Sequence, residues 1–305
     1  MERLIDPNKK NGIDTFGAVS LIFISGLLGI NHVVIKIVND GINPVFFCGL
    51  RSLIAMLCIY IWMQYRGVQV DFFSKHWKYG ILAGIVFALE FLFLFVALDY
   101  TTVVRNSIIY YSMPLWLSLM AHFTLPHDKI NAIKVLGLIL AFLGVIWAFF
   151  DKETVDSEFT IIGDLCALAG ALGWAILILI ARGTKFSLIK PEMQLLWMVT
   201  VSAPILIASS FLYSELIREF LFIHFLGLLF QAVIVVTFGF IFWLWLLSIY
   251  PASGVASFAF LTPLFGITFG WLILDEKLSV TIFGAGFMVI LGIYLINRGD
   301  TKSEP

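Results

Sequence analysis

The chain has 305 residues, of which 61% are hydrophobic and only 13% charged, and its mean hydropathy is +1.00. Soluble domains carry roughly 45–50% apolar and about 25% charged residues, so this composition excludes a water-soluble globular protein and indicates a helical membrane protein. The net charge of −1, without a basic stripe, excludes nucleic acid as a partner. Membrane lipid is the expected environment, and the chain is expected to be a monomer or a homodimer.

The first 15 residues are polar, and the apolar run behind them lacks a small-residue cleavage site, so 1–15 is predicted to be a tail rather than a removable signal peptide. Ten apolar segments follow, each long enough to cross about 30 Å of hydrocarbon as a helix. The connections carry turn-forming or charged residues and are too short for a soluble domain. A second tail is predicted at 298–305. The expected spans lie near 16–37, 44–65, 77–98, 105–125, 132–150, 161–181, 191–211, 221–247, 253–273 and 279–297.

The distribution of cations in the connections predicts how these spans are oriented. If the N-terminus is inside, only five of the 19 Lys and Arg residues fall on the outer side, namely Lys36, Arg105, Lys152, Arg218 and Lys277. Cytoplasmic connections are enriched in these cations, so both termini are predicted to be cytoplasmic. We expect a multi-pass protein of the bacterial cytoplasmic (inner) membrane.

The first apolar segment ends with the polar side chains of Asn31, His32 and Lys36. His32 and Lys36 are four residues apart and therefore share one helix face. A polar face inside the membrane favours a role in lining a cavity for a substrate. Lys36 is nearer the end of the span, where it could instead extend toward water.

Arg51 and Glu90 lie inside the second and third segments, where an ionisable side chain must face a cavity or a partner. Glu90 has two interpretations. It could bind and release a proton during a transport cycle, with His32 as a second proton carrier, or it could form a fixed ion pair with Arg51, Lys36 or His32.

Later segments add aromatic and amide side chains that could bind an amphipathic or cationic compound. Aromatic residues near span ends can equally form an interfacial belt. The cavity candidates here are Tyr110, Tyr111, Trp174, Gln231 and Trp243.

No metal site or cofactor is expected. Cys48, Cys58 and Cys166 lie in apolar segments without the spacing of a metal or disulfide site, so we interpret them as small buried hydrophobic residues.

The chain contains an internal repeat. Residues 97–115, "ALDYTTVVRNSIIYYSMPL", align with 246–264, "LLSIYPASGVASFAFLTPL", with Pro114 on Pro263. Each half is then predicted to hold five helices, over 16–150 and 161–297. Because five is an odd number of membrane crossings, the second half enters the membrane from the side opposite to the first. The predicted fold class is therefore an all-α membrane protein of ten transmembrane helices in two inverted five-helix repeats, an arrangement that recurs in transporters.

Several segments together resemble the drug/metabolite transporter superfamily, EamA type. They are "GLLGINHVVIKIVNDGINPVFFCGLRSLIA" (26–55), "ALDYTT" (97–102), Pro114, "GDLCALAGALGWA" (163–175) and "LTPLFGITFGWLILDEKLS" (261–279). In the second repeat, Glu276 occupies the glutamate position of the "LxE" motif that such proteins often carry. In the first repeat, the equivalent position is His127. The resemblance implies secondary transport, often export, of amino acids and other small metabolites.

The expected function is export of a small amphipathic metabolite by alternating access. A proton-independent exchanger or facilitator of organic cations is the alternative. An intramembrane enzyme is not favoured, because the chain has no GxSxG, no HExxH and no paired aspartates on facing spans. A channel is not favoured either, because nothing predicts a ring of charges or carbonyls.

Overall fold

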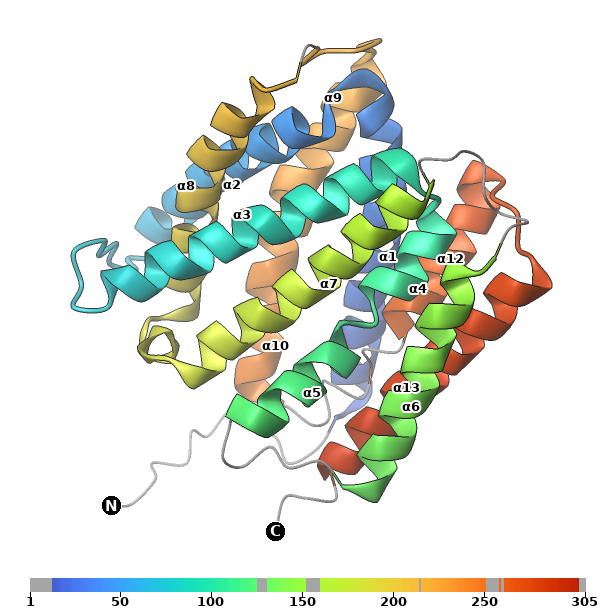
Figure 1. Cartoon of the computed structure of the whole chain (residues 1–305). Coiled ribbons are helices and arrows are strands. Elements are labelled where there is room, and N and C mark those ends of the chain that lie inside the picture. The colour runs from blue at the N-terminus through green and yellow to red at the C-terminus, as the bar shows by residue number, and fades with distance from the viewer. Residues whose placement is uncertain are drawn as a thin grey trace, which may run out of the picture.

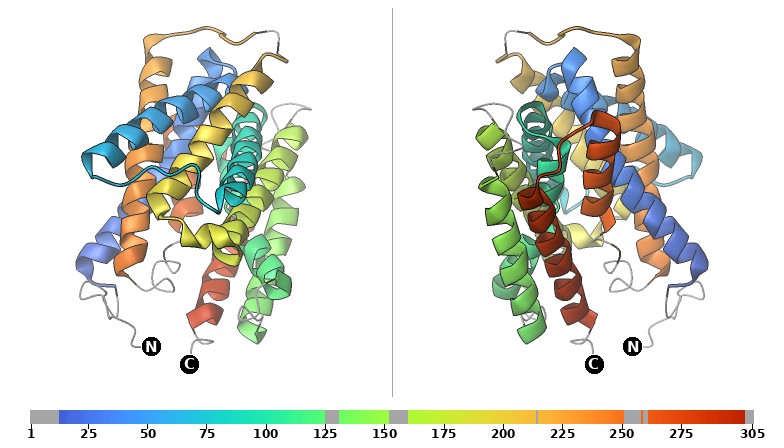
Figure 2. Two further views of the ribbon diagram at one scale, coloured as in Figure 1. Left: turned by 90° about the vertical axis from the view of Figure 1, so that its left-hand side faces the viewer. Right: turned by 90° about the vertical axis from the view of Figure 1, so that its right-hand side faces the viewer.

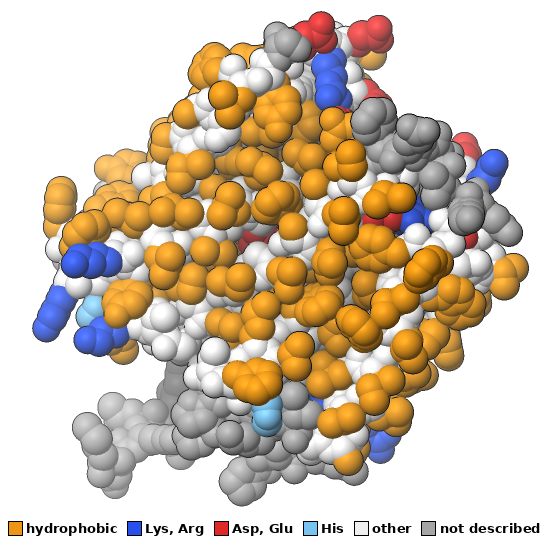
Figure 3. All heavy atoms as spheres, in the orientation of Figure 1, with side chains coloured by type: hydrophobic (Ala, Val, Ile, Leu, Met, Phe, Trp, Pro, Cys, Tyr) orange, Lys and Arg blue, Asp and Glu red, His pale blue; other side chains and the backbone are white. Residues whose placement is uncertain are grey.

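A computed structural model describes residues 13–124, 131–151, 160–213, 215–250, 258 and 261–301. The regular elements of these ranges are helices packed into one bundle (Figure 1). Seven helical stretches in them are long and apolar enough to cross a membrane. Figure 3 shows apolar side chains over most of one face, with charged side chains mostly near its edges. An apolar surface of this kind suits contact with lipid.

The helices of the first half follow the predicted spans closely until the fourth. Asp14 caps the first helix, because its Oδ1 accepts from the amide of Gly17 at 2.9 Å, and Asn43 caps the second, which starts at Pro44. The observed bounds are α1 Thr15–Gly41, α2 Pro44–Tyr65, α3 Trp77–Tyr100, α4 Val103–Tyr110, α5 Met113–Thr124 and α6 Ala132–Phe149.

The prediction of one continuous helix over 105–125 is wrong. The segment forms two helices that are interrupted at Tyr111 and Ser112. Pro114 explains the break, because its ring would clash with the carbonyl four residues earlier, which belongs to Tyr110. The break leaves Tyr110 and Tyr111 at the end of a half-helix inside the bundle.

The second half contains a different interruption. The run predicted over 221–247 is α-helical at both ends but a π-helix in its middle, where Gln231 lies. Part of the span predicted over 253–273 lies outside the described residues. The observed bounds are α7 Thr160–Gly183, η1 Lys185–Leu188, α8 Pro191–Ser210, α9 Phe222–Leu229, η2 Phe230–Gly239, α10 Phe240–Ile249, α12 Leu261–Leu274 and α13 Val280–Thr301.

Helices of the two halves pack against each other in matching pairs. The first helix of each half packs on the segment around the repeated proline of the other half: α1 packs on α12, which contains Pro263, and α7 packs on α4 and on α5, which contains Pro114. α2 packs on α8, and α6 on α13. α1 begins at the end of the bundle where α13 terminates (Figure 2). We call the opposite end, where α1 and α3 terminate and α4 begins, the distal end.

Two close contacts of glycines occupy corresponding positions in the two halves of the chain. A Cβ added to Gly17 would lie 2.6 Å from the ring of Tyr250, and one added to Gly163 would lie 2.7 Å from the backbone nitrogen of Thr101. Tyr250 follows Thr101 by 149 positions (250 − 101), the offset that separates Pro263 from Pro114 (263 − 114). The contact at Gly163 is with backbone and leaves no space for a larger residue, whereas a larger residue at Gly17 would require the ring of Tyr250 to move.

Candidate functional site

Polar side chains from both halves meet in the interior of the bundle. They come from α1, α2, α3, α4 and η2, and each is at most 4% exposed. The interior is otherwise lined by aliphatic and aromatic residues. We call this group the polar cluster, and its members are Asn31, His32, Arg51, Glu90, Asn106, Tyr110 and Gln231.

Glu90 is bound on one side only. The hydroxyl of Tyr110 donates to Oε1 at 2.8 Å, whereas the buried Oε2 has no hydrogen-bond partner. Of the two interpretations of Glu90, the fixed ion pair does not occur, since Glu90 forms no salt bridge with Arg51, Lys36 or His32 in the part of the chain that the structure describes. A buried carboxylate oxygen without a donor is a free acceptor that could bind a proton or a donor group of water or a ligand.

Arg51 also lacks a carboxylate partner. Its guanidinium carbon lies 4.0 Å from the centre of the Phe91 ring and 4.9 Å from that of Phe95. The faces of these rings attract the cation, but they leave Nε and Nη2 buried without hydrogen bonds. Arg51 thus lies beside the residue that follows Glu90 in α3 and offers unused donors.

His32 is held by α4. The amide nitrogen of Asn106 lies 3.0 Å from His32 Nδ1, and the ring stacks on Tyr111 with centroids 4.8 Å apart and planes 8° from parallel. Because an amide nitrogen only donates, Nδ1 accepts and the ring proton is placed on Nε2. The Oδ1 of Asn106 has no partner.

Asn31 and Gln231 join the two halves directly. Gln231 Nε2 donates to Asn31 Oδ1 at 2.5 Å and to the Asn31 carbonyl at 3.1 Å, while its own Oε1 is buried without a partner. The π-helical turn places Gln231 in this position, and such turns are frequent at functional sites. The Asn31–Gln231 pair is thus a buried polar contact between α1 and the second half of the chain.

An aromatic group adjoins the polar cluster. Trp174 of α7 stacks on Tyr110 with centroids 5.3 Å apart and lies 6.2 Å from Tyr111. Tyr111 donates its hydroxyl to the carbonyl of Leu28 at 2.8 Å. Gly173 of α7 lies directly against Glu90, because a Cβ added to it would be 3.2 Å from the Cα and Cβ of Glu90.

Two sequence candidates lie elsewhere. Trp243 packs near the start of α1 with Leu21, Ile24 and Leu27. Lys36 donates to the carbonyls of Leu98 and Thr101 at the end of α3. The polar cluster therefore contains Asn31, His32, Arg51, Glu90, Tyr110 and Gln231 of the predicted set, with Tyr111 and Trp174 beside it.

Sequence reasoning missed Asn106 and did not foresee that Arg105 is buried. Arg105 was counted among outer connections, but it is fully buried at the start of α4. It binds both carboxylate oxygens of Asp164, and Nη1 lies 3.4 Å from an oxygen of Asp151. We call these three residues the distal anchor. The run of three polar residues "RNS" after "TTVV" was the available signal, because it is unusual at the start of a span.

No group of three or more His, Cys, Asp or Glu residues among the described residues is arranged to hold a metal ion. The three cysteines are free thiols.

Comparison with known proteins identifies the family. The model of the EamA-like transporter family matches residues 15–150 and 161–298. The chain belongs to the EamA-like transporter family. It is thus a transporter of the drug/metabolite type and a multi-pass membrane protein, as its apolar helices also indicate.

Named relatives cover nearly the whole chain. It is 24% identical over 279 residues to the "Uncharacterized transporter YoaV" of Bacillus subtilis, covering 91% of this chain and 95% of that protein. It is 23% identical over 276 residues to a "Probable amino-acid metabolite efflux pump" of Escherichia coli, covering 88% and 90%. A solved structure described as "Crystal structure of protein" shares the fold, with a TM-score of 0.67, 16% identity and coverage of 94% and 98%.

Proposed function

We propose that this chain is a secondary transporter that exports a small metabolite, with an amino acid as the first choice, by alternating access across the bacterial cytoplasmic membrane. The observation that carries this proposal is the polar cluster, whose buried Glu90 Oε2, Asn106 Oδ1 and Gln231 Oε1 have no partners. Leaving a buried polar atom unpaired costs about 1–3 kcal/mol, so a partner that enters the cluster is favoured. Residues from both halves would contact that partner.

The charges of the polar cluster favour a zwitterion. Arg51 provides donors for a carboxylate, and Glu90 provides an acceptor for an ammonium group. An α-amino acid carries both groups on one small molecule. The E. coli relative named as an amino-acid metabolite efflux pump supports the same substrate class and direction.

Organic cations are the second candidate class, and the aromatic group beside Glu90 favours them. The faces of Tyr110, Tyr111 and Trp174 can attract a cation while Glu90 neutralises it. Arg51→Gln separates the two classes. It should weaken transport of an amino acid strongly and leave transport of an amine that lacks a carboxylate unimpaired.

The decisive experiment is counterflow in proteoliposomes with a panel of labelled amino acids and amines. A carrier loaded with unlabelled substrate takes up the labelled form, whereas protein-free liposomes do not. Arg51→Gln tests the polar cluster, and Arg66→Gln at the exposed C-cap of α2 is the matched control. The proposal fails if no member of the panel exchanges, or if both variants reduce exchange equally.

The proposed topology has ten spans in two inverted five-helix repeats, with both termini cytoplasmic. It makes Ser157 external and Lys185 internal. Single cysteines at these positions, in a protein without Cys48, Cys58 and Cys166, should react oppositely with an impermeant thiol reagent added to intact cells. Reaction at 185 but not at 157 would reverse the orientation.

A further inference from the structure

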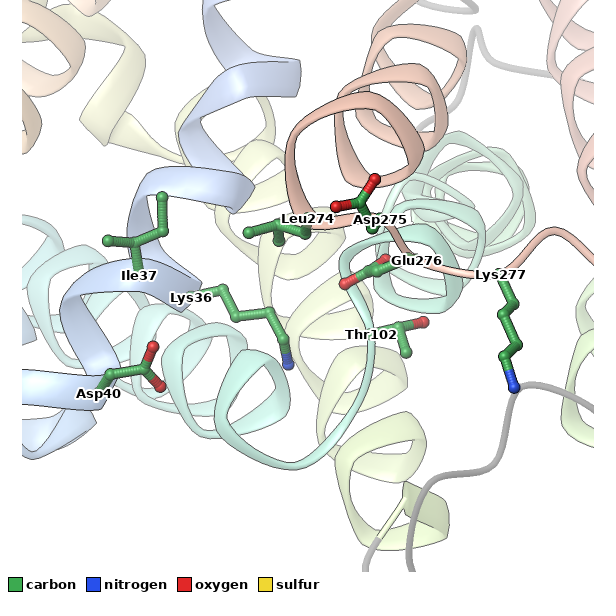
Figure 4. Close-up of a pocket in the computed structure, with 8 residues that line it drawn as sticks. All are labelled: Lys36, Ile37, Asp40, Thr102, Leu274, Asp275, Glu276 and Lys277. Atoms are coloured by element: carbon green, nitrogen blue, oxygen red, sulfur yellow. The ribbon is translucent and has the colours of Figure 1, made fainter.

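A cavity of about 320 Å³ opens at the distal end, outside the polar cluster. It lies between the last turns of α1 and the connection from α12 to α13, with Thr102 between them (Figure 4). Lys36 and Asp40 line one side and Glu276 the other. Its walls therefore come from both halves of the chain.

Two rows of polar residues connect this cavity with the polar cluster. On α1, Asp40, Lys36 and His32 are four residues apart and share one face. On α4 and its N-cap, Thr102, Asn106 and Tyr110 have the same spacing.

Each row runs from the cavity into the cluster. Lys36 and Thr102 line the cavity, His32 and Asn106 contact each other, and Tyr110 reaches Glu90. The rows thus define a polar route from the cavity to Glu90.

Glu276 lies at the cavity and binds the start of α4. Its Oε1 accepts from the amide of Val103 at 2.7 Å, and its Oε2 accepts from the amide of Val104 at 2.8 Å. These amides form the first turn of α4, where an anionic partner is favoured by the helix dipole. Glu276 belongs to the second half and α4 to the first, so the contact joins the halves.

Lys36 binds the C-terminal end of α3, the helix that precedes α4. Its Nζ donates to the carbonyl of Leu98 at 3.2 Å and to that of Thr101 at 2.7 Å. A cation at the C-terminus of α3 and an anion at the N-terminus of α4 each match the local helix dipole. The corner between the two helices is thus fixed from both sides.

We propose that this cavity is the external vestibule of the transport route and that Glu276 is the latch that closes the route beneath it. This inference rests on the proposed function. α4 has only eight residues and is bounded by the break at Tyr111, so release of its first turn frees it from α12 without unfolding a longer helix. Opening of the latch joins the vestibule to the polar cluster.

The test measures labelling from outside intact cells with a small, impermeant, cationic methanethiosulfonate reagent, in the background without native cysteines. The reporter is Ser107→Cys, because Ser107 is fully buried and packs against Gly266 of α12 beneath the latch. Glu276→Ala should accelerate labelling by roughly tenfold or more, since it removes two charge-assisted hydrogen bonds. Glu276→Gln, which keeps one acceptor, should give a smaller increase and provides a test if the alanine variant does not fold.

Two controls define the outcomes. Thr102→Cys should label quickly whether or not Glu276 is intact, because Thr102 lines the vestibule, and Asp275→Asn should leave labelling of the 107 reporter unchanged. Unaltered labelling at 107 in folded Glu276→Ala and Glu276→Gln proteins would overturn the latch. Failure of Thr102→Cys to react from outside would overturn the vestibule. Neither readout requires transport, so a failure here is distinct from a failure of counterflow.

Discussion

The distal anchor and the polar cluster are both buried and both contain charged side chains, but their charges are satisfied differently. In the distal anchor, Arg105 binds the carboxylate of Asp164 in α7 and that of Asp151, which follows the end of α6. In the polar cluster, Arg51 and Glu90 are not paired and keep polar atoms without partners. We propose that this difference separates a site that holds helices together from a site that binds a ligand.

The surroundings of the two sites agree with this distinction. Thr101 donates to Asp164 at 2.7 Å and Ser279 donates to Asp151 at 2.7 Å, so the carboxylates of the anchor have additional donors. Glu90 has one donor, Tyr110. A half-satisfied buried network lowers stability and persists most readily where function requires it.

The largest expected effect comes from breaking the distal anchor. Asp164→Ala would leave the cation of Arg105 buried without its main partner, and we expect a loss of about 3–5 kcal/mol in the free energy of unfolding. Unfolding of the purified protein in detergent measures this loss. The double variant Arg105→Met with Asp164→Leu should recover part of it, because the buried cation is removed and the carboxylate of Asp151 still has Ser279 as a donor. A double variant as unstable as Asp164→Ala would show that the anchor does not act through its charges.

Glu90→Gln should affect transport more than stability. The amide can still accept the hydrogen bond from Tyr110, but it cannot carry a proton, so accumulation driven by a pH gradient should be lost while substrate exchange persists. His32→Gln tests the second proton carrier in the same assay. Normal accumulation in both variants would exclude both residues as the coupling site.

Combining Arg51→Gln with Glu90→Gln tests whether the two side chains form a direct pair. The two side chains form no salt bridge, so Arg51→Gln should not restore stability that Glu90→Gln loses. A partial rescue of Glu90→Gln by Arg51→Gln would instead indicate a direct pair between them.

A smaller effect is expected when the hydroxyl of Tyr110, which donates to Glu90, is removed. Tyr110→Phe removes its one donor and should weaken substrate binding by roughly tenfold, the loss of one hydrogen bond to a charged group. The matched control is Tyr111→Phe, whose hydroxyl binds the Leu28 carbonyl instead. Half-saturating concentrations in the counterflow assay report the change. Equal losses in the two variants would show that the effect of Tyr110→Phe does not arise from the lost hydrogen bond to Glu90.

The smallest effect is expected at a partly exposed ion pair of the distal end. Arg218 donates to both oxygens of Asp99 at 2.6 and 2.8 Å, and its hydrogen bond to Asp99 raises the pKa of the guanidinium above its ordinary value. A raised pKa stabilises the fold at every pH below the ordinary pKa of a guanidinium, so this contribution is constant through the physiological range.

Arg218→Gln should therefore cost at most about 1 kcal/mol of unfolding free energy, and less in high salt. Unfolding in detergent at two salt concentrations measures it. A loss as large as that of Asp164→Ala would place this pair among the main supports of the distal end.

Much of the helical layout was predictable, because a segment in hydrocarbon must satisfy its own backbone hydrogen bonds and cross a fixed thickness. α2 follows the predicted span to the residue, and α3 and α8 differ from theirs by one or two residues. The split of the fourth span was missed. Pro114 was visible, but a proline in a span predicts a bend as readily as a break.

The sequence by itself determined which segments are helical and which polar residues lie in their interiors, because the apolar environment makes each such residue conspicuous. It did not determine their partners. Glu90 binds Tyr110 rather than Arg51, and Arg105 is buried rather than exposed, because these contacts depend on how helices distant in sequence cross one another. Helix packing sets those crossings through close contacts such as Gly163 on Thr101, and only the tertiary structure shows them.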